Sequence, residues 1–284
     1  MKKIAIVTDS SASLDENYVK RFNIHVIPLK LHWNGMDFED GVDITPIEFY
    51  ERLEKSSTIP TTSQPPAEEF FKKFEELAPH YDGIAVPLIS SGISGTVDSA
   101  KAAASSFSKL PIEIIDTQST QAGLALIIKE IIKAVSEGKN LDEIHRLSEV
   151  IREQLELYFV VDTLKYLHKG GRIGGASRYL GTLLNIKPIL YIDKEGKIDA
   201  FEKAHTKGKA LVRLIELVDK KADGRMVNAG IMHANVHEEA NRLGKILREK
   251  INCSNLDTYP ISPVIGTHVG PGALGIAFYP KEIE

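Results

Sequence analysis

The sequence predicts an α/β protein with two domains, and three observations support this prediction. The chain has 284 residues, of which 43% are apolar and 26% charged, so it can bury a sizeable core and has about the length of two domains. In the first half, short β-rich runs alternate with helical patterns, as in a parallel sheet covered by helices. The second half reads as a smaller α/β sandwich. We therefore expect an N-terminal parallel-sheet domain over residues 1–155 and a C-terminal domain over residues 156–284.

Local signals define the elements of the first half. Thr45 and Glu48 have the spacing of a capping box, with proline between them at the first helical position, and predict a helix through about Lys55. A second helix is expected just after Ser63, where apolar residues then recur at helical spacing, and a third near Ser94. The expected strands are Ile4–Val7, His25–Leu31, Gly83–Ile89 and Ile112–Asp116.

The middle of the chain is predicted to connect the two domains. A helical pattern runs from Gln118 to Leu155 and is broken at residues 138–140, which indicates a pair of helices that bridges the domains. The elements expected after this pair are a strand at Leu157–Thr163, a hairpin of Lys187–Asp193 and Lys197–Phe201, a helix at Ala210–Lys221, a strand at Met226–His233 and a helix at His237–Lys250.

Composition excludes several classes of protein. The net charge is −4 and the basic residues are spread over polar helix faces, which argues against nucleic acid as a partner. Cys253 is the sole cysteine, so no intrachain disulfide can form and a reducing compartment fits best. No apolar run approaches the ~18 residues of a membrane span, and the N-terminal one is too short for a signal peptide. We expect a soluble, cytoplasmic protein without stable membrane insertion.

Three segments rich in small polar residues form the candidate site: residues 61–65, 90–96 and 266–272. In an open parallel sheet the ligand crevice lies outside the carboxyl ends of the strands, where we expect two of these segments. Helix N-termini, hydroxyl groups and a histidine can all donate hydrogen bonds, and glycine allows the backbone to approach closely. This chemistry suits a small anion. For Ser63 a role as a helix N-cap is the alternative, and for Asp9 a role in closing a turn.

Several common motifs are absent from the sequence. It contains no phosphate-binding loop and no dinucleotide-binding fingerprint after a strand, and its Cys, His and acidic residues lack metal-ligand spacing. We therefore expect neither a metal nor a cofactor. Ser94 lacks the second glycine of a nucleophile elbow, so a nucleophilic serine is weakly supported.

An ordered set of short motifs strongly resembles the DegV family. The motifs cover nearly the whole chain, over residues 3–281, and their order carries the resemblance because each alone is common. They are Val7–Ser10, Val26–Leu29, Gly41–Ile44, Thr62–Pro65, Ser90–Thr96, Lys169–Ile173, Ile186–Ile189 and Gly266–Gly272.

The resemblance implies a two-domain α/β protein with a buried acyl-chain pocket, and a ligand such as palmitate, stearate or oleate. Characterised relatives are the fatty-acid-binding subunits of bacterial fatty acid kinase, in which a separate ATP-using subunit phosphorylates the carboxylate to an acyl phosphate. By this resemblance Thr62, Ser94 and His268 contact the carboxylate, and Arg172 matches an arginine linked to kinase function. Ser63, which belongs to the same motif as Thr62, is a further candidate for binding the carboxylate.

Residues near these contacts are expected to support the carboxylate site. They are Asp9, Ser91, Gly95 and Thr267.

Two alternatives remain open at this stage. One is a serine hydrolase with Ser94 as nucleophile, His268 as base and Asp9 as the residue that orients it. The other is a lipid-responsive interaction module without a kinase, because His205 stands where family members that act with the kinase often carry arginine. The acyl chain length and the oligomeric state do not follow from the sequence.

Overall fold

The computed structural model describes residues 3–181 and 186–282, and its first sheet is parallel throughout. All six residues of the strand Ile4–Asp9 are buried, as expected for a strand with helices on both faces of its sheet. The sheet has the order β2 (Ile24–Ile27), β1 (Ile4–Asp9), β6 (Gly83–Leu88) and β7 (Ile112–Asp116). The predicted α/β class is confirmed.

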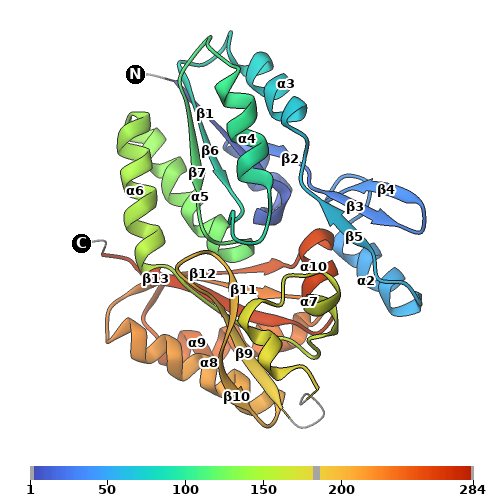
Figure 1. Ribbon diagram of the computed structural model, residues 1–284. Helices are drawn as coiled ribbons and strands as arrows, with labels where there is room; N and C mark the ends of the chain where they lie inside the picture. The colour runs from blue at the N-terminus through green and yellow to red at the C-terminus, as the bar shows by residue number, and fades with distance from the viewer. Residues whose placement is uncertain (1–2, 182–185, 283–284) are drawn as a thin grey trace.

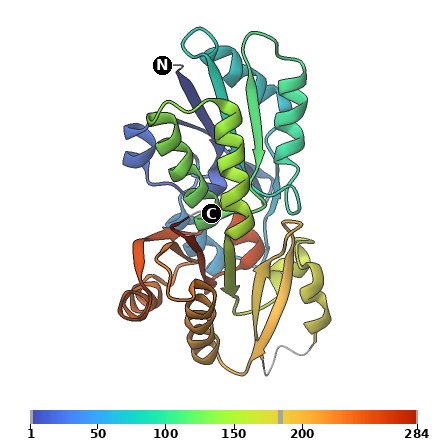
Figure 2. The same cartoon turned by 90° about the vertical axis from the view of Figure 1, so that its left-hand side faces the viewer.

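A second, mixed sheet lies below the parallel sheet (Figures 1 and 2). Its order is β10 (Ile198–Ala204), β9 (Lys187–Ile192), β8 (Glu156–Val160), β13 (Leu274–Pro280), β11 (Val227–His233) and β12 (Cys253–Pro260). Only β11 and β12 pair in parallel among these described strands. The parallel sheet ends at residue 116 and the mixed sheet begins at residue 156. A domain boundary after residue 155 is compatible with this arrangement and stays a prediction.

The helices lie in layers around the two sheets (Figure 1). The helices α3 (Ala67–Leu77) and α4 (Thr96–Ser105) cover one face of the parallel sheet, and α8 (Lys207–Ala222) and α9 (His237–Lys250) cover the lower face of the mixed sheet. The helices α5 (Gln121–Ser136) and α6 (Leu141–Gln154) contact strands of both sheets. Most of α5 is buried, because it is apolar nearly all round. It joins the two sheets through one shared core.

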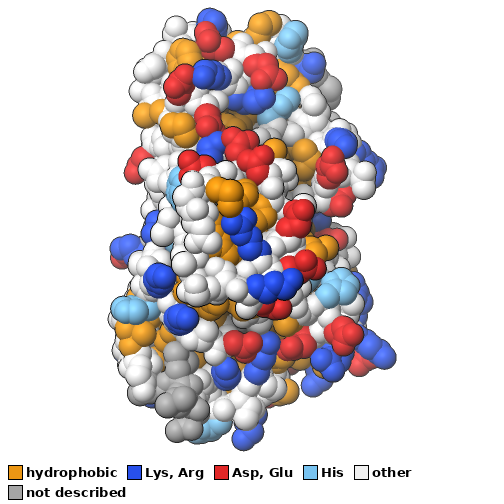
Figure 3. Space-filling view, turned by 90° about the vertical axis from the view of Figure 1, so that its right-hand side faces the viewer, with side chains coloured by type: hydrophobic (Ala, Val, Ile, Leu, Met, Phe, Trp, Pro, Cys, Tyr) orange, Lys and Arg blue, Asp and Glu red, His pale blue; other side chains and the backbone are white. Residues whose placement is uncertain are grey.

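A small antiparallel sheet projects from the side of the molecule beside α2 (Pro46–Lys55), where Figure 1 places it at the right. Its order is β4 (Met36–Glu39), β3 (Lys30–Trp33) and β5 (Thr61–Ser63). Both β3 and α2 pack against the short helix α10 (Pro263–Val269). The Tyr50 hydroxyl donates to the carbonyl oxygen of Ile261 at 3.2 Å, just before that helix. Figure 3 shows basic and acidic side chains interspersed on this side of the molecule.

The remaining helical segments are short. They are the 3-10 turns η1 (Ser10–Ala12) and η2 (Gly174–Tyr179) and the α-helices α1 (Glu16–Arg21) and α7 (Lys165–Lys169).

Two of the predicted elements need correction. The single strand expected over residues 25–31 is two strands in different sheets, because the chain leaves the parallel sheet at Pro28, which has no N–H to donate. The second helix does not begin at Ser63, which ends β5; it begins at Ala67, because Pro65 and Pro66 favour extended backbone before it. The predicted N-cap role of Ser63 is therefore wrong.

The capping box, in contrast, is confirmed. The Glu48 carboxylate accepts from the Thr45 amide at 2.9 Å, and the Thr45 hydroxyl accepts from the Glu48 amide at 3.3 Å. The helix then runs to Lys55 as predicted.

Candidate functional site

A pocket lies where the parallel, mixed and small sheets approach one another. It contains about 770 Å³ of space not filled by protein atoms, part of it open to solvent. Its apolar lining consists of Leu29, Ile89, Ile93, Leu157, Phe159, Ile192, Ile198, Met232, Ile261, Val264, Ile265 and Val269. Its polar lining consists of Thr62, Ser63, Gln64, Ser94, Thr120, Gln121, Arg172 and His268.

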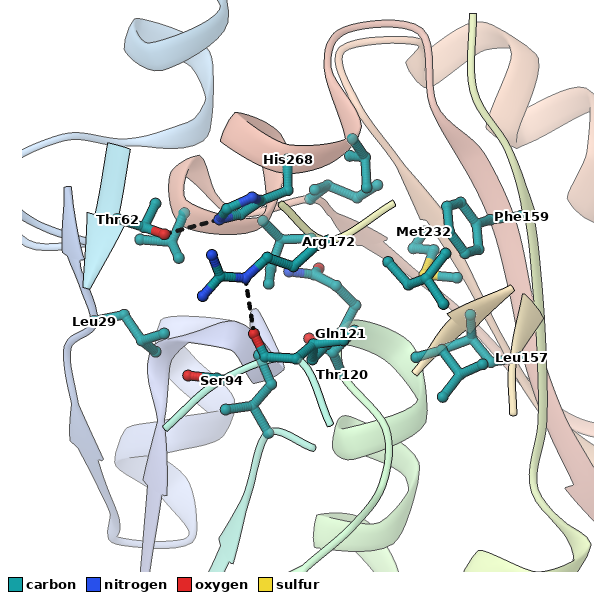
Figure 4. Close-up of a pocket in the computed structure, with 18 of the residues that line it drawn as sticks. Leu29, Thr62, Ser94, Thr120, Gln121, Leu157, Phe159, Arg172, Met232 and His268 are labelled. Carbon is teal, nitrogen blue, oxygen red and sulfur yellow. Dashed lines mark hydrogen bonds between the residues drawn. The ribbon is translucent and has the colours of Figure 1, made fainter. Parts of the chain in front are cut away.

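Part of the polar lining and part of the apolar lining lie at opposite ends of the pocket, although the apolar Leu29 lies beside Thr62 and Ser94. In Figure 4, Thr62, Ser94, Arg172 and His268 gather at one end, whereas the apolar residues Leu157, Phe159 and Met232 lie at the other. We call these the polar end and the apolar end. The division matches the shape of an amphipathic molecule with a small polar head and a long apolar tail.

The segments of the polar end come from distant parts of the chain. Thr62 is the central residue of β5 and pairs with the buried residue Leu31 of β3. His268 lies in the last turn of α10, whose N-cap is Ser262. The hydroxyl of Thr62 and Nε2 of His268 are hydrogen-bonded at 2.8 Å. This bond joins the small sheet to the C-terminal part of the chain.

Ser94 lies in the turn that leads from β6 to α4. Its backbone amide donates to the Ser90 carbonyl at 3.1 Å, and its hydroxyl is hydrogen-bonded to the Thr96 hydroxyl at 2.8 Å. The Ser90 hydroxyl donates to the Gly196 carbonyl at 2.8 Å, in the turn between β9 and β10. The segment that carries Ser94 is thereby fixed against the mixed sheet.

Burial keeps the His268 imidazole uncharged well below neutral pH. Burial, and to a smaller extent the positive charge of Arg172, lower the pKa of His268 to about 4. A Cβ atom on Gly170 would lie 2.2 Å from Nδ1 of His268, so only glycine allows the ring to lie here. Neutral imidazole offers one donor and one acceptor, so His268 can hydrogen-bond an anion.

Arg172 brings a permanent positive charge to the rim of the pocket. Its Nε donates to the Ile93 carbonyl at 3.1 Å and its Nη1 to the Gly170 carbonyl at 2.8 Å (Figure 4 marks the first). The side chain is exposed. Its guanidinium group can therefore reach both a head group in the pocket and a molecule outside it.

Ser63 lines the pocket, but its hydroxyl is hydrogen-bonded to another group. The distance from its oxygen to Nε2 of His32 is 2.9 Å, and Nδ1 of His32 lies 2.6 Å from a carboxylate oxygen of Asp37. Successive side chains of a strand point to opposite faces, so Ser63 and Thr62 project in opposite directions.

The four residues predicted to support the carboxylate do not line the pocket. The buried carboxylate of Asp9 accepts from the amides of Ser11 and Ile89 at 2.9 and 2.7 Å. Ser91 is hydrogen-bonded to Asp116. The Thr267 hydroxyl donates to a carbonyl within its own helix. The fourth, Gly95, leaves space for the Gln64 amide, from which an added Cβ would be 2.7 Å away.

The hydrolase hypothesis receives no support from these contacts. The hydroxyl of Ser94 bonds to Thr96 and Nε2 of His268 bonds to Thr62, so no hydrogen bond links Ser94 to His268 among the described residues. Asp9 is engaged with backbone amides. A serine nucleophile needs its base within hydrogen-bonding reach.

Sequence reasoning missed two polar residues of the pocket, Thr120 and Gln121. They follow β7 at the start of α5, with relative exposures of 7% and 1%. A polar segment after a strand was the signal that identified residues 90–96, and the same signal precedes α5 at residues 117–120.

Two other kinds of structural feature are absent from the described part of the chain. No helix there is long and apolar enough to cross a membrane. Within residues 3–181 and 186–282, no group of three or more His, Cys, Asp and Glu side chains is arranged to hold a metal ion.

The fold and the pocket together define a class of α/β protein, in which a parallel and a mixed sheet meet at a pocket that is polar at one end and apolar at the other. The family model described as "Uncharacterised protein, DegV family" matches residues 3–281. The chain belongs to the DegV family.

Known relatives match over nearly the full length of both chains. A DegV domain-containing protein of Clostridium acetobutylicum is 36% identical over 282 residues, which are 99% of this chain and 100% of that protein. The structure described as DegV, a fatty acid binding protein from Bacillus subtilis, has a TM-score of 0.91 and 34% identity, covering 99% and 100% of the two chains. A DegV family protein from Thermus thermophilus, described by its fatty acid binding, has a TM-score of 0.93 and 31% identity, covering 98% and 99%.

Proposed function

We propose that this protein binds one long-chain fatty acid in the pocket. The carboxylate accepts hydrogen bonds from Thr62, Ser94 and His268, which replace the bond between Thr62 and His268; Ser63, whose hydroxyl is bonded to His32 in the ligand-free protein, lies at the edge of the same site. The tail, as in palmitate, stearate or oleate, lies along the apolar lining. The observation that carries the proposal is the division of one pocket into a polar and an apolar end. Fatty acid binding by the Bacillus subtilis and Thermus thermophilus relatives supports it.

The energetics of such a ligand are favourable. Each buried methylene contributes roughly 0.8 kcal/mol, so a sixteen-carbon tail offers on the order of 10 kcal/mol before ordering costs. A buried carboxylate has to be hydrogen-bonded, because an isolated buried charge is very unfavourable. The two hydroxyls and the imidazole supply hydrogen bonds, and the Arg172 guanidinium adds a favourable charge at the rim.

Extraction of the purified protein under denaturing conditions, followed by mass spectrometry, tests this proposal. We expect about one fatty acid per chain from wild type, and much less from Ser94→Ala or His268→Ala. Ser91→Ala is the matched control, because Ser91 is a nearby serine outside the pocket. Wild-type protein that carries no fatty acid, and takes up none of the palmitate or oleate offered to it, would overturn the proposal.

We further propose that the bound acid is presented to a separate ATP-dependent kinase subunit, which converts the carboxylate to an acyl phosphate. The protein is then not an enzyme by itself. The kinase would supply ATP and Mg²⁺, and this chain would supply a carboxylate held near the rim of the pocket. The exposed Arg172 side chain is placed to contact the partner or the incoming phosphate.

A reconstituted kinase assay tests this second proposal. With a bacterial kinase subunit, ATP and loaded protein, we expect an acyl phosphate that hydroxylamine traps as the hydroxamate. Arg172→Ala should slow this reaction and still carry the fatty acid. His205→Arg restores the residue found in kinase-dependent relatives and should raise the rate. Absence of the hydroxamate with both wild type and His205→Arg would favour the lipid-responsive interaction module.

A further inference from the structure

The pocket contains two buried polar groups that the carboxylate site does not use. The hydroxyl of Thr120 and the amide oxygen Oε1 of Gln121 have no hydrogen-bond partner among the described residues. Both residues line the pocket. Figure 4 places them between the polar end and the apolar residues Leu157, Phe159 and Met232. Buried polar groups in proteins nearly always have a partner, so an unpaired couple inside a ligand pocket points to the ligand.

The orientation of the Gln121 amide is set by its neighbours. Its Nε2 lies 3.4 Å from the hydroxyl oxygen of Ser262, the N-cap of α10. The same Ser262 oxygen accepts from the Ile265 amide at 3.4 Å. The amide nitrogen of Gln121 thus donates to Ser262, and Oε1 is left as an acceptor without a donor among the described residues.

The backbone at Gln121 is also constrained. Its φ is +51°, in the left-handed region that residues other than glycine seldom adopt. This conformation occurs in the first residue of α5. Strain of this kind persists where the surrounding structure enforces it, and it is concentrated at ligand sites.

Gln121 Oε1 is an acceptor and the Thr120 hydroxyl can donate, and this combination selects the chemistry of the ligand. A carboxylate cannot pair with Oε1, because both groups have only acceptor oxygens. A plain hydrocarbon tail would leave both Oε1 and the Thr120 hydroxyl unpaired. A hydroxyl group satisfies both, because it donates one hydrogen bond and accepts another.

We propose that the pocket is built for a long-chain fatty acid that bears a hydroxyl group along its chain. The hydroxyl donates to Gln121 Oε1 and accepts from the Thr120 hydroxyl. This inference rests on the proposed fatty acid binding and names a narrower class of ligand.

Competition binding on delipidated protein tests the inference. The probes are palmitic and stearic acid and their monohydroxy derivatives, with the hydroxyl at carbon 2, 3, 10 or 12. We expect at least one derivative to bind roughly tenfold more tightly than the unsubstituted acid of the same length, as two modest hydrogen bonds would give. The best position reports how far the two residues lie from the carboxylate.

The variants Thr120→Val and Gln121→Met remove the polar atoms and nearly keep the side-chain shape. In each variant, the affinity for the best hydroxy acid divided by the affinity for the unsubstituted acid of the same length should fall towards one. Ser119→Ala is the matched control, since the Ser119 hydroxyl is equally buried and unpaired but does not line this pocket. It should keep the wild-type ratio.

The possible failures are distinguishable. Wild type that binds palmitic and stearic acid but prefers none of the hydroxy acids would overturn this inference and leave the proposed function standing. Equal preference for a hydroxy acid in wild type and in both variants would also overturn it. Wild type that binds none of the acids would overturn the proposed function and this inference together.

Discussion

The polar and apolar ends of the pocket are built in opposite ways. The polar end brings together β5, the turn after β6 and the last turn of α10, three segments far apart in the chain. The apolar end uses Leu157, Phe159 and Met232, from two strands of one mixed sheet. Binding at the polar end depends on a few hydrogen bonds at fixed positions. Binding at the apolar end depends on how much apolar surface area the ligand buries. We therefore expect head-group recognition to be sensitive to single atoms, and tail binding to depend on the number of methylenes.

Shortening the ligand should have the largest effect on affinity. Octanoate has eight methylenes fewer than palmitate, and at roughly 0.8 kcal/mol each this loss amounts to about 6 kcal/mol, or on the order of 10⁴-fold. Isothermal titration of delipidated protein measures the ratio. Octanoate that binds within tenfold of palmitate would mean that the apolar end does not hold the tail.

Removing a donor from the polar end should have an intermediate effect. A hydrogen bond to a charged group contributes about 1.5–3 kcal/mol, so Ser94→Ala should weaken palmitate binding by roughly 10- to 100-fold. Isothermal titration of the delipidated variant with palmitate measures this loss of affinity. Methyl palmitate serves as the control ligand, because without a carboxylate it should bind wild type and Ser94→Ala with more similar affinities. An equal loss for both ligands would indicate damage to the pocket instead of loss of a head-group contact.

The buried imidazole of the polar end should make the stability of the ligand-free protein depend on pH. The pKa of His268 is about 4 in the folded protein, against about 6.5 when unfolded. Between these values the unfolded state binds more protons, so the contribution of His268 to stability falls as the pH is lowered from 6.5 towards 4.

Denaturant unfolding of wild type and His268→Gln at pH 7, 6 and 5 measures this contribution. The free energy of unfolding of the variant relative to wild type should rise as the pH falls, by at most about 1.4 kcal/mol per pH unit. The raised pKa of Asp40, about 6 because of burial, acts with the opposite sign and cancels in the difference. A difference that does not change with pH would contradict a buried neutral His268.

A residue near the pocket but outside its lining should have the smallest effect. Ser91 is exposed and bonded to Asp116, so Ser91→Ala should change palmitate affinity by less than about twofold. A loss as large as that of Ser94→Ala would extend the polar end to the whole segment of residues 90–96.

Features that depend on local sequence patterns could be predicted, whereas features that depend on contacts between distant segments could not. The α/β class, the capping box at Thr45 and the helix at residues 237–250 follow from local patterns, and the structure agrees. The segments that hold Thr62, Ser94 and His268 could be singled out because small polar residues gather in them, and the resemblance to the DegV family selected these three residues, all of which line the pocket. Their contacts with a carboxylate stay a prediction.

Other features depend on long-range contacts. Met232 and Phe159 look like ordinary core residues, because lining a pocket and filling a core require the same side chains. The split of residues 25–31 occurs at Pro28, but the sheet that each half joins depends on strand pairing with distant segments. The free acceptor of Gln121 depends on Ser262, which is distant in sequence.

A crystal structure with bound palmitate tests the central claim most directly. We predict one carboxylate within hydrogen-bonding distance of Thr62, Ser94 and His268, and a tail that runs past Phe159 and Met232. A carboxylate at the apolar end, or palmitate bound outside this pocket, would contradict the account.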